Sequence, residues 1–398
     1  MTMTLTTQVL IGSFVIALIL GAVVYKTHFC TLGAISDWIN IGDSGRFRSW
    51  MLAIAVALAG VLILENGFGV SFDQTRPPYR TAEFAWLRYL LGGFMFGVGM
   101  TLASGCTSKN LVRFGGGNFK SLVVLAMVAV FSYLMTKTDF YAYLFHSWMS
   151  PLAIDLTGLD RSAQDLGTLI AGDEQARTVR LWLGGLLTIA LLLWCFASAE
   201  FRRHSDNIVG GIVVGLCIVG GWYLTGGSLG QEWIEEVEWL DVPPLGVGVQ
   251  SYTFVNPLGE AMVYLANPAD TLLVTFGVAA VAGMLLGSFG YAIATGRWRW
   301  EWFHSWVDLI RHIIGGALMG IGGVLAMGCT FGQGITGVST LALGSLLALG
   351  AIMLGSATTM KIEYYRMLYE DASLWDALLS GWADLRLLPR SARRLEAL

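Results

Sequence analysis

Residues 88–107 read RYLLGGFMFGVGMTLASGCT, and residues 311–330 read RHIIGGALMGIGGVLAMGCT. The two stretches align without gaps at a constant offset of 223 residues and are identical at ten of twenty positions. Five of the shared residues are glycines, and both stretches end in Gly-Cys-Thr. Chance similarity between two apolar helices would not place glycine and cysteine at matching positions. The pattern therefore indicates an internal duplication.

The composition of the whole chain is that of a membrane protein. Of 398 residues, 13% are charged, whereas a soluble domain carries about 25%. This excludes a soluble enzyme, and the formal net charge of −4 argues against a nucleic-acid-binding protein. A span needs about 20 mostly apolar residues, so we expect an all-α polytopic membrane protein with about nine transmembrane helices. The predicted spans are 8–25, 49–66, 84–104, 119–137, 179–198, 207–225, 270–294, 309–327 and 338–358.

The two repeated stretches are predicted to cross the membrane in opposite directions. The first lies in the third span and the second in the eighth, and odd and even spans run oppositely. Inverted repeats are typical of transporters, whose sites form near the midplane at the repeat interface. The connection 226–269 has no Lys or Arg, whereas the tail after residue 360 has six. The positive-inside rule then predicts a periplasmic N-terminus and a cytoplasmic C-terminus.

We expect four parts along the chain. Residues 1–140 form a first transmembrane repeat, and residues 141–178 form an extracytoplasmic connection. Residues 179–360 form the second transmembrane repeat. Residues 361–398 form a cytoplasmic tail, in which apolar and charged residues alternate as in an amphipathic helix at the membrane surface.

Polar, glycine-rich segments follow each repeated stretch. They read SGCTSKNLVRFGGGN (104–118) and MGCTFGQGITGVS (327–339), and each is too short to span a membrane. Non-helical backbone at membrane depth is tolerated only where it is buried in protein or lines a cavity, so we expect both to be re-entrant. A third interruption, KTHFCTLGAISDW (26–38), contains Cys30, and the same offset aligns this cysteine with Thr253.

Three of the five cysteines are candidates for a substrate pathway. Cys106 and Cys329 share the duplicated Gly-Cys-Thr context, and Cys30 occupies the third polar interruption. Cys195 and Cys217 lie in apolar surroundings and are expected to be small buried hydrophobes. The sequence has no CxxC pair and no cluster of histidines and cysteines at zinc spacing, so neither a metal site nor a cofactor is expected.

Charged residues in or beside the polar segments are further candidates. Lys109 and Arg113 fall in the first segment, where a charge in the membrane is functional by default. The alternative is that both face the cytoplasm as ordinary positive-inside residues. Glu260 lies near the corresponding segment of the second half, where it could cap a helix or pair with a basic group of the site.

Hydroxyl, amide and glycine residues of the two segments complete the candidate set. Thr107, Thr330 and Gln333 could hydrogen-bond substrate oxygens, or they could satisfy the backbone. Gly105 and Gly328 are expected to provide turn geometry and close approach of the chain, which is a structural role.

The segments FGVGMTLASGCTSKNLVRFGGG and GGALMGIGGVLAMGCTFGQGITGVS resemble the two signature regions of the YeeE/YedE family of bacterial inner-membrane sulfur transporters. HFCTLGAISDW resembles the first cysteine segment of that family. The resemblance implies import of thiosulfate along three cysteines, at the positions of Cys30, Cys106 and Cys329, often assisted by a cytoplasmic TusA-like sulfur-carrier protein. The 138–178 connection and the tail after 360 depart from the family pattern, which leaves the choice among sulfur and selenium anions open.

Three thiols suit such a pathway because a neutral thiol is a weak hydrogen-bond donor and its sulfur is polarisable. Thiols can bind a terminal sulfur loosely, and conduction needs binding that is weak enough for exit. Two alternatives remain from the sequence. The protein could be a membrane enzyme that accepts sulfane sulfur covalently on a cysteine, or it could transport another oxyanion such as selenite.

Overall fold

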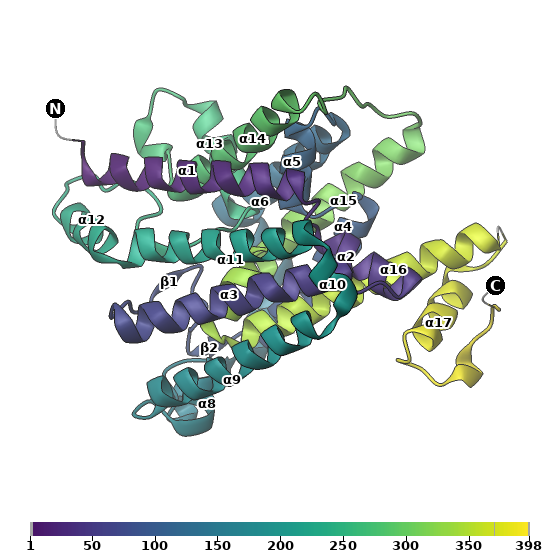
Figure 1. Cartoon of the computed structure of the whole chain (residues 1–398), viewed down its shortest axis with the longest axis horizontal. Coiled ribbons are helices and arrows are strands. Elements are labelled where there is room, and N and C mark those ends of the chain that lie inside the picture. The colour runs from purple at the N-terminus through teal and green to yellow at the C-terminus, as the bar shows by residue number, and fades with distance from the viewer. Residues whose placement is uncertain (1–2, 370, 397–398) are drawn as a thin grey trace.

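The computed structural model describes residues 3–369 and 371–396 and is almost entirely helical (Figure 1). Within these residues, nine helices are long and apolar enough to cross a membrane, which confirms the predicted spans. They are α1 (Leu5–Lys26), α3 (Gly45–Gly67), α4 (Trp86–Leu102), α6 (Lys120–Lys137), α9 (Ala176–Ala197), α11 (Ser205–Gly226), α14 (Phe276–Ala294), α15 (Trp306–Leu325) and α16 (Leu343–Leu368).

Short helical segments and two small strand pairs occupy the connections. The helical segments are α2 (Thr31–Ser36), η1 (Asp37–Ile41), α5 (Thr107–Gly115), η2 (Ala142–His146), α7 (Ser147–Met149), η3 (Ser150–Leu152), η4 (Leu156–Leu159), α8 (Leu166–Ala171), α10 (Ala199–Arg203), α12 (Ser228–Glu238), α13 (Asn256–Ala266), η5 (Thr271–Leu273), η6 (Gly332–Gly337), η7 (Val338–Thr340), α17 (Leu374–Asp384) and η8 (Arg390–Ala392). Strand β1 (Thr75–Arg76) pairs parallel with β4 (Val249–Gln250), and β2 (Glu83–Phe84) pairs antiparallel with β3 (Ile154–Asp155).

The two repeated helices, α4 and α15, cross at their shared glycines. A Cβ atom on Gly92 would lie 2.7 Å from the carbonyl oxygen of Gly322, and one on Gly99 would lie 2.6 Å from that of Gly315. Residue numbers rise along one helix as they fall along the other, so the two helices are antiparallel. Small residues at such a crossing allow the backbones to approach closely.

Six of the other seven described spanning helices pack in corresponding pairs around this crossing, and α9 packs against α3. Helix α4 packs against α16, and its counterpart α15 packs against α6. In the same way α1 packs against α14, and α11 packs against α3. This packing agrees with a duplicated architecture. The opposite insertion of the two halves into a membrane stays a prediction.

Helices α4 and α15 also end in the same way. Ser104 and Met327 adopt left-handed backbone conformations, with φ of 55° and 57°. The next residue in each case returns a backbone hydrogen bond to the helix: Gly105 donates to Met100 at 2.9 Å, and Gly328 donates to Gly323 at 2.7 Å. The left-handed conformation therefore falls one residue before each glycine. The two turns direct the following cysteines into the same region between the halves.

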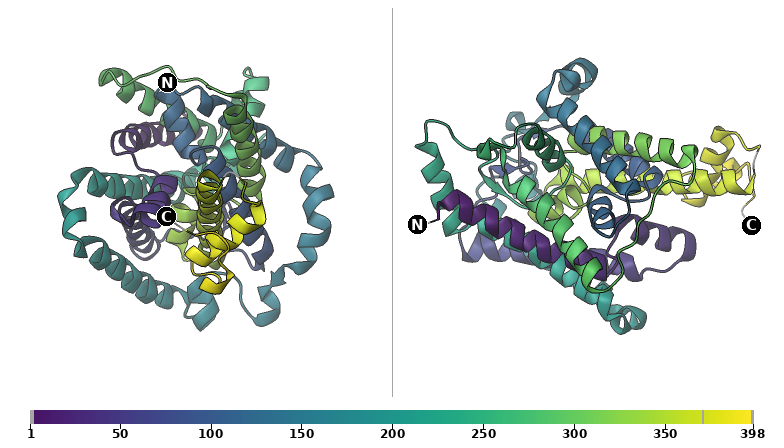
Figure 2. Two further views of the ribbon diagram at one scale, coloured as in Figure 1. Left: turned by 90° about the vertical axis from the view of Figure 1, so that its right-hand side faces the viewer. Right: turned by 90° about the horizontal axis from the view of Figure 1, so that it is seen from above.

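The 138–178 connection packs against the end of the second polar segment. Its strand β3 pairs with β2. The Leu343 amide donates to the Gln164 carbonyl, and the Leu166 amide donates to the Leu341 carbonyl. At the other end of the molecule, α17 folds back on α16, where the Trp382 indole donates to Thr358 at 3.1 Å. The described N- and C-terminal residues lie at opposite ends of the long axis (Figure 2).

Candidate functional site around three cysteines

The three candidate cysteines each begin a polar segment. Cys30 and Cys106 have extended backbone conformations and immediately precede α2 and α5, and Cys329 lies three residues before η6. The Cys30 sulfur accepts a hydrogen bond from the Gly33 amide at 3.4 Å, and the Cys329 sulfur accepts one from the Gly332 amide at 3.5 Å. Each thiol therefore lies at the start of a helical turn, whose first N–H groups have no partner within the helix.

The structure brings Cys106 close to Cys30 and to Thr330, the residue that follows Cys329. Cys106 Sγ lies 3.2 Å from the Ser108 hydroxyl, whereas it is not at hydrogen-bond distance from the Thr330 hydroxyl. Cys329 interacts with Thr253, the residue that the repeat aligns with Cys30. Cys106 and Cys329 are buried, and Cys30 is half-buried.

The other two cysteines lie elsewhere. Cys195 packs between α9 and α3, where its thiol donates to the Arg48 carbonyl at 3.3 Å. Cys217 packs against α1, with its sulfur 3.9 Å from the carbonyl oxygen of Ile16. Both are buried in apolar clusters, as their sequence surroundings predict.

A threonine follows each of the three candidate cysteines. The hydroxyl oxygens of Thr31, Thr107 and Thr330 are all buried, and none has a hydrogen-bond partner among the described residues. A buried polar group without a partner costs about 1–3 kcal/mol, so three of them in one region indicate a place for a polar ligand. Thr31 was not among the sequence candidates, although the Cys-Thr pair that contains it occurs three times in the chain.

Asn110 and Gln333 occupy equivalent positions, four residues after Cys106 and Cys329. The Asn110 amide nitrogen donates to the Gly105 carbonyl at 2.8 Å, and that of Gln333 donates to the Ala326 carbonyl at 2.5 Å. Only their carbonyl oxygens remain unpaired. The sequence left open whether Gln333 bonds to substrate oxygens or to the backbone. In this structure its amide nitrogen donates to a backbone carbonyl.

Two cavities flank the cysteines, and both contain arginine. The first, which we call the Arg76 cavity, has a volume of about 540 Å³. Its charged and polar lining includes Arg76, Arg88, Gln250, Thr253, Asn256 and Glu260. Because Thr253 interacts with Cys329, this cavity lies beside Cys329.

The second, which we call the Arg113 cavity, has a volume of about 300 Å³. Its charged and polar lining includes His28, Lys109, Arg113, Arg297, Arg299 and Glu301. Lys109 and Arg113 lie on α5, the helix that Cys106 begins, and Arg113 donates to the Ser104 carbonyl at 2.8 Å. The sequence singled out these two residues, but it missed the arginines that loops bring from other parts of the chain.

Glu260 is the acidic residue of the Arg76 cavity. It lies on α13, and its Oε2 accepts a hydrogen bond from the Thr275 hydroxyl at 2.6 Å. Burial raises the pKa of Glu260, although the hydrogen bond from Thr275 and the positive charges of Lys137 and Arg76 act in the opposite direction.

Buried side chains hold the second polar segment in place. The Tyr79 hydroxyl donates to the Gly332 carbonyl at 2.8 Å, and Arg80 donates to the Thr340 carbonyl at 3.1 Å. Arg80 also belongs to a buried ion-pair network. In this network Glu65 lies 2.8 Å from both Arg80 and Arg180, and Arg180 lies 3.2 Å from Asp165.

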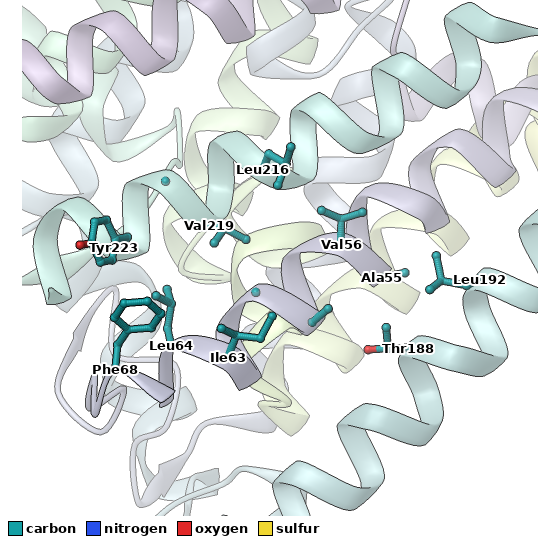
Figure 3. Close-up of a pocket in the computed structure, with 13 residues that line it drawn as sticks. Ala55, Val56, Ile63, Leu64, Phe68, Thr188, Leu192, Leu216, Val219 and Tyr223 are labelled. Atoms are coloured by element: carbon teal, nitrogen blue, oxygen red, sulfur yellow. The ribbon is translucent and has the colours of Figure 1, made fainter. Parts of the chain in front are cut away.

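A further cavity of about 590 Å³ lies between α3, α9 and α11 (Figure 3). Its lining is almost wholly apolar, and Figure 3 shows only the Thr188 hydroxyl and the Tyr223 hydroxyl among the labelled polar atoms. An anion would lose its hydration there without gaining hydrogen bonds. This cavity is therefore separate from the candidate site.

Comparison with known proteins identifies the family. The sequence model of the sulphur transport family matches residues 26–358. A thiosulfate transporter TsuA of Escherichia coli is 23% identical over 380 residues, which cover 90% of this chain and 96% of that protein. A thiosulfate transporter TsuA of Spirochaeta thermophila is 25% identical over 355 residues, which cover 88% of this chain and 98% of that protein. The chain is a multi-pass membrane protein that belongs to the sulphur transport family.

Proposed function

We propose that this protein carries thiosulfate, or a closely related sulfur-containing anion, across the membrane along its three cysteines. The observation that supports this most directly is that residues beside the cysteines line two arginine-containing cavities. Thr253, which interacts with Cys329, lines the Arg76 cavity, and His28 and Lys109, close to Cys30 and Cys106 in the chain, line the Arg113 cavity. The names of the two relatives support the choice of thiosulfate. The pathway runs from the Arg76 cavity past the thiols to the Arg113 cavity.

The cluster offers different groups to the two ends of thiosulfate. The hydroxyls of Thr31, Thr107 and Thr330 can donate to sulfonate oxygens, while the thiols contact the terminal sulfur. Arginines concentrate the anion in the cavities at either end. The three cysteines and three threonines of the cluster carry no fixed positive charge. Several weak sites in sequence allow the anion to enter and also to leave.

The direction of transport follows from the predicted topology. With the N-terminus in the periplasm and the C-terminus in the cytoplasm of a bacterial inner membrane, the Arg76 cavity faces outward and the Arg113 cavity faces inward. A TusA-like sulfur-carrier protein would then receive the anion at the Arg113 cavity. Membrane lipid would contact the α17 tail, whose Leu374 and Trp375 side chains are exposed.

Uptake into proteoliposomes tests the proposal. Purified protein is reconstituted, and the uptake of labelled thiosulfate, sulfite, sulfate and selenite is compared at equal concentration. We expect thiosulfate to enter fastest. Preference for selenite would change the assigned substrate, and absence of uptake of every sulfur anion by inserted protein would contradict transport. A persulfide on Cys106 or Cys329 during turnover, detected by mass spectrometry, would favour covalent sulfur transfer instead.

A further inference from the structure

Glu260 has no role in attracting an anion, yet it lines the cavity through which we propose that the anion enters. It is the acidic residue among those lining the Arg76 cavity, and a carboxylate there repels a dianion. A half-buried carboxylate in this position therefore needs an explanation other than substrate attraction.

The geometry allows Glu260 to exist in either protonation state. Thr275 donates to Oε2 of Glu260 at 2.6 Å, and the Thr275 oxygen itself accepts from the Val278 amide at 3.1 Å. A hydroxyl is both a donor and an acceptor. By reorienting its proton, Thr275 can bond to an ionised carboxylate or accept from a protonated carboxyl group.

The elements around Glu260 that carry charged or polar groups are α6, β1, η5 and α14. Lys137 at the end of α6 and Arg76 in β1 interact with the carboxyl group. Near η5, the carboxylate of Asp270 is occupied by the Leu272 amide at 3.0 Å. Helix α14 contributes the hydroxyl of its capping residue, Thr275.

Another cavity, of about 140 Å³ and distinct from both arginine-containing cavities named above, lies against the same carboxyl group. It is lined by Arg76, Lys137, Glu260 and Thr275, among others. Glu260 is thus shared between the cavity that would hold the anion and a smaller one lined by basic residues. A change in charge at this position is felt in both.

We propose that Glu260 is a proton-binding site coupled to anion binding in the Arg76 cavity. When a sulfur-containing dianion enters, the carboxylate takes up one proton from water on the side to which the cavity is open. When the anion leaves, the carboxyl group returns the proton to water. This inference rests on the proposed function, and it adds the binding of one proton to the binding of the anion. By linkage, the anion favours the proton as much as the proton favours the anion.

The electrostatics act in the direction that this coupling requires. Burial already raises the pKa of Glu260 above that of an ordinary glutamate. An incoming dianion raises it further because two like charges in one site disfavour ionisation. At low pH the carboxyl group is neutral and the anion binds well, and as pH rises the carboxylate forms and the anion binds more weakly.

The pH dependence of KM for thiosulfate uptake tests the inference. We expect the KM of the unmodified protein to rise about tenfold between external pH 6 and pH 8, since one pKa unit of coupling corresponds to tenfold in affinity. Glu260→Gln keeps the shape of the side chain and cannot ionise, so its KM should stay low over the whole range. Glu235→Gln removes an exposed carboxylate from α12, outside the cavity, and should behave as the unmodified protein does.

A second pair of variants covers the case in which Glu260→Gln does not fold. Thr275→Val removes the donor to the carboxylate and should shift the rise in KM to higher pH, whereas Thr275→Ser should not. The inference is overturned if Glu260→Gln retains the pH dependence, if KM of the unmodified protein is flat, or if Thr275→Val leaves the profile unchanged. Absence of thiosulfate uptake by the unmodified protein would instead overturn the proposed function, and the inference with it.

Discussion

At the residue scale, the Cys-Thr pair is the unit from which the candidate site is built. The sequence predicted Cys106 and Cys329 from their duplicated context and Cys30 from its polar segment, and the structure brings Cys30 close to Cys106. Arg76 and Arg88 could not be predicted in the same way. Arg76 comes from the connection before α4 and Arg88 from the first turn of α4, and only the packing of these parts against the second half places them at a cavity.

The first prediction concerns the thiols. We expect Cys106→Ala and Cys329→Ala each to abolish thiosulfate uptake, because each removes a weak donor from the pathway that we propose between the two cavities. Cys195→Ala and Cys217→Ala should leave uptake near the unmodified level, since both thiols bond to backbone away from the site. Uptake is measured in proteoliposomes at matched protein content. Equal tolerance of all four substitutions would contradict a thiol-lined pathway.

The second prediction concerns the unpaired hydroxyls. Thr107→Val and Thr330→Val keep the side-chain shape but remove a donor to an anionic oxygen, which is worth about 1.5–3 kcal/mol. We expect kcat/KM for thiosulfate to fall roughly 10- to 100-fold, at 1.4 kcal/mol per factor of ten. Thr107→Ser and Thr330→Ser retain the hydroxyl and should keep most of the activity. If valine and serine variants behave alike, the hydroxyls do not contact the substrate.

At the scale of elements, glycines determine how closely the repeated helices approach. The crossing of α4 and α15 leaves no room for side chains at Gly99 and Gly315, whose backbones meet. The repeated glycine spacing is visible in the sequence. It did not indicate the partners, because helix packing depends on which faces meet after folding.

The third prediction compares two glycine positions on helices. Gly99→Ala would place a Cβ atom 2.6 Å from the Gly315 carbonyl, so we expect a lower melting temperature and less folded protein in detergent. Gly185→Ala on α9 meets nothing within 4 Å and should be neutral or stabilising, because alanine favours a helix by up to about 1 kcal/mol over glycine. Equal melting temperatures for both variants would show that the crossing is looser than described.

The buried ion pairs connect four parts of the chain: α3, α9, the connection before α4 that contains Arg80, and the 138–178 connection. Asp165 lies fully buried at the start of α8, and Glu65 near the end of α3. Burial by itself would raise the pKa of Asp165, but Arg80, the Thr168 hydroxyl and Arg180 together lower it below the usual value. The sequence predicted that this connection lies outside the membrane and departs from the family pattern. It did not predict that the connection supports the second polar segment.

The fourth prediction follows from the lowered pKa of Asp165. Asp165→Asn leaves Arg180 without one of its two partners, and breaking a buried pair costs about 3–5 kcal/mol. A carboxyl group with a lowered pKa stabilises the fold above its unfolded pKa of about 3.9, and this contribution is lost as pH falls through the folded value. The variant should therefore melt below the unmodified protein at pH 7, and the difference should shrink toward pH 3. A difference that is constant with pH would contradict an ionised Asp165.

At the scale of the whole molecule, the sequence predicted the architecture better than the site. The nine spans follow from apolar length, which the bilayer dictates, and the structure confirms their number within the described residues. The duplication is visible as a constant offset because both halves retain the same glycines. Part of the lining of the Arg113 cavity could not be predicted, since Arg297, Arg299 and Glu301 belong to a connection that only the folded chain brings beside α5.

The last prediction concerns the orientation of the whole molecule. If the two halves are inverted, Ser228 at the start of α12 lies outside and Ser205 at the start of α11 lies inside, because α11 crosses the membrane between them. Both side chains are exposed, so each can carry a reporter. In a Cys30→Ala background, which removes the half-buried native thiol, Ser228→Cys should react with an impermeant maleimide added to intact cells. Ser205→Cys should react only after the membrane is opened.

This arrangement is what positive-inside charge predicts, because Arg202 and Arg203 immediately precede Ser205, whereas the 226–269 connection has no basic residue. The unmodified background in intact and opened cells controls for reaction at native cysteines. The reverse labelling pattern would place the Arg113 cavity outside, and uptake would then begin at Arg113 rather than at Arg76. Labelling of both positions from the same side would show that α11 does not cross the membrane. The inverted repeat would then lose its basis, which is that odd and even spans run in opposite directions.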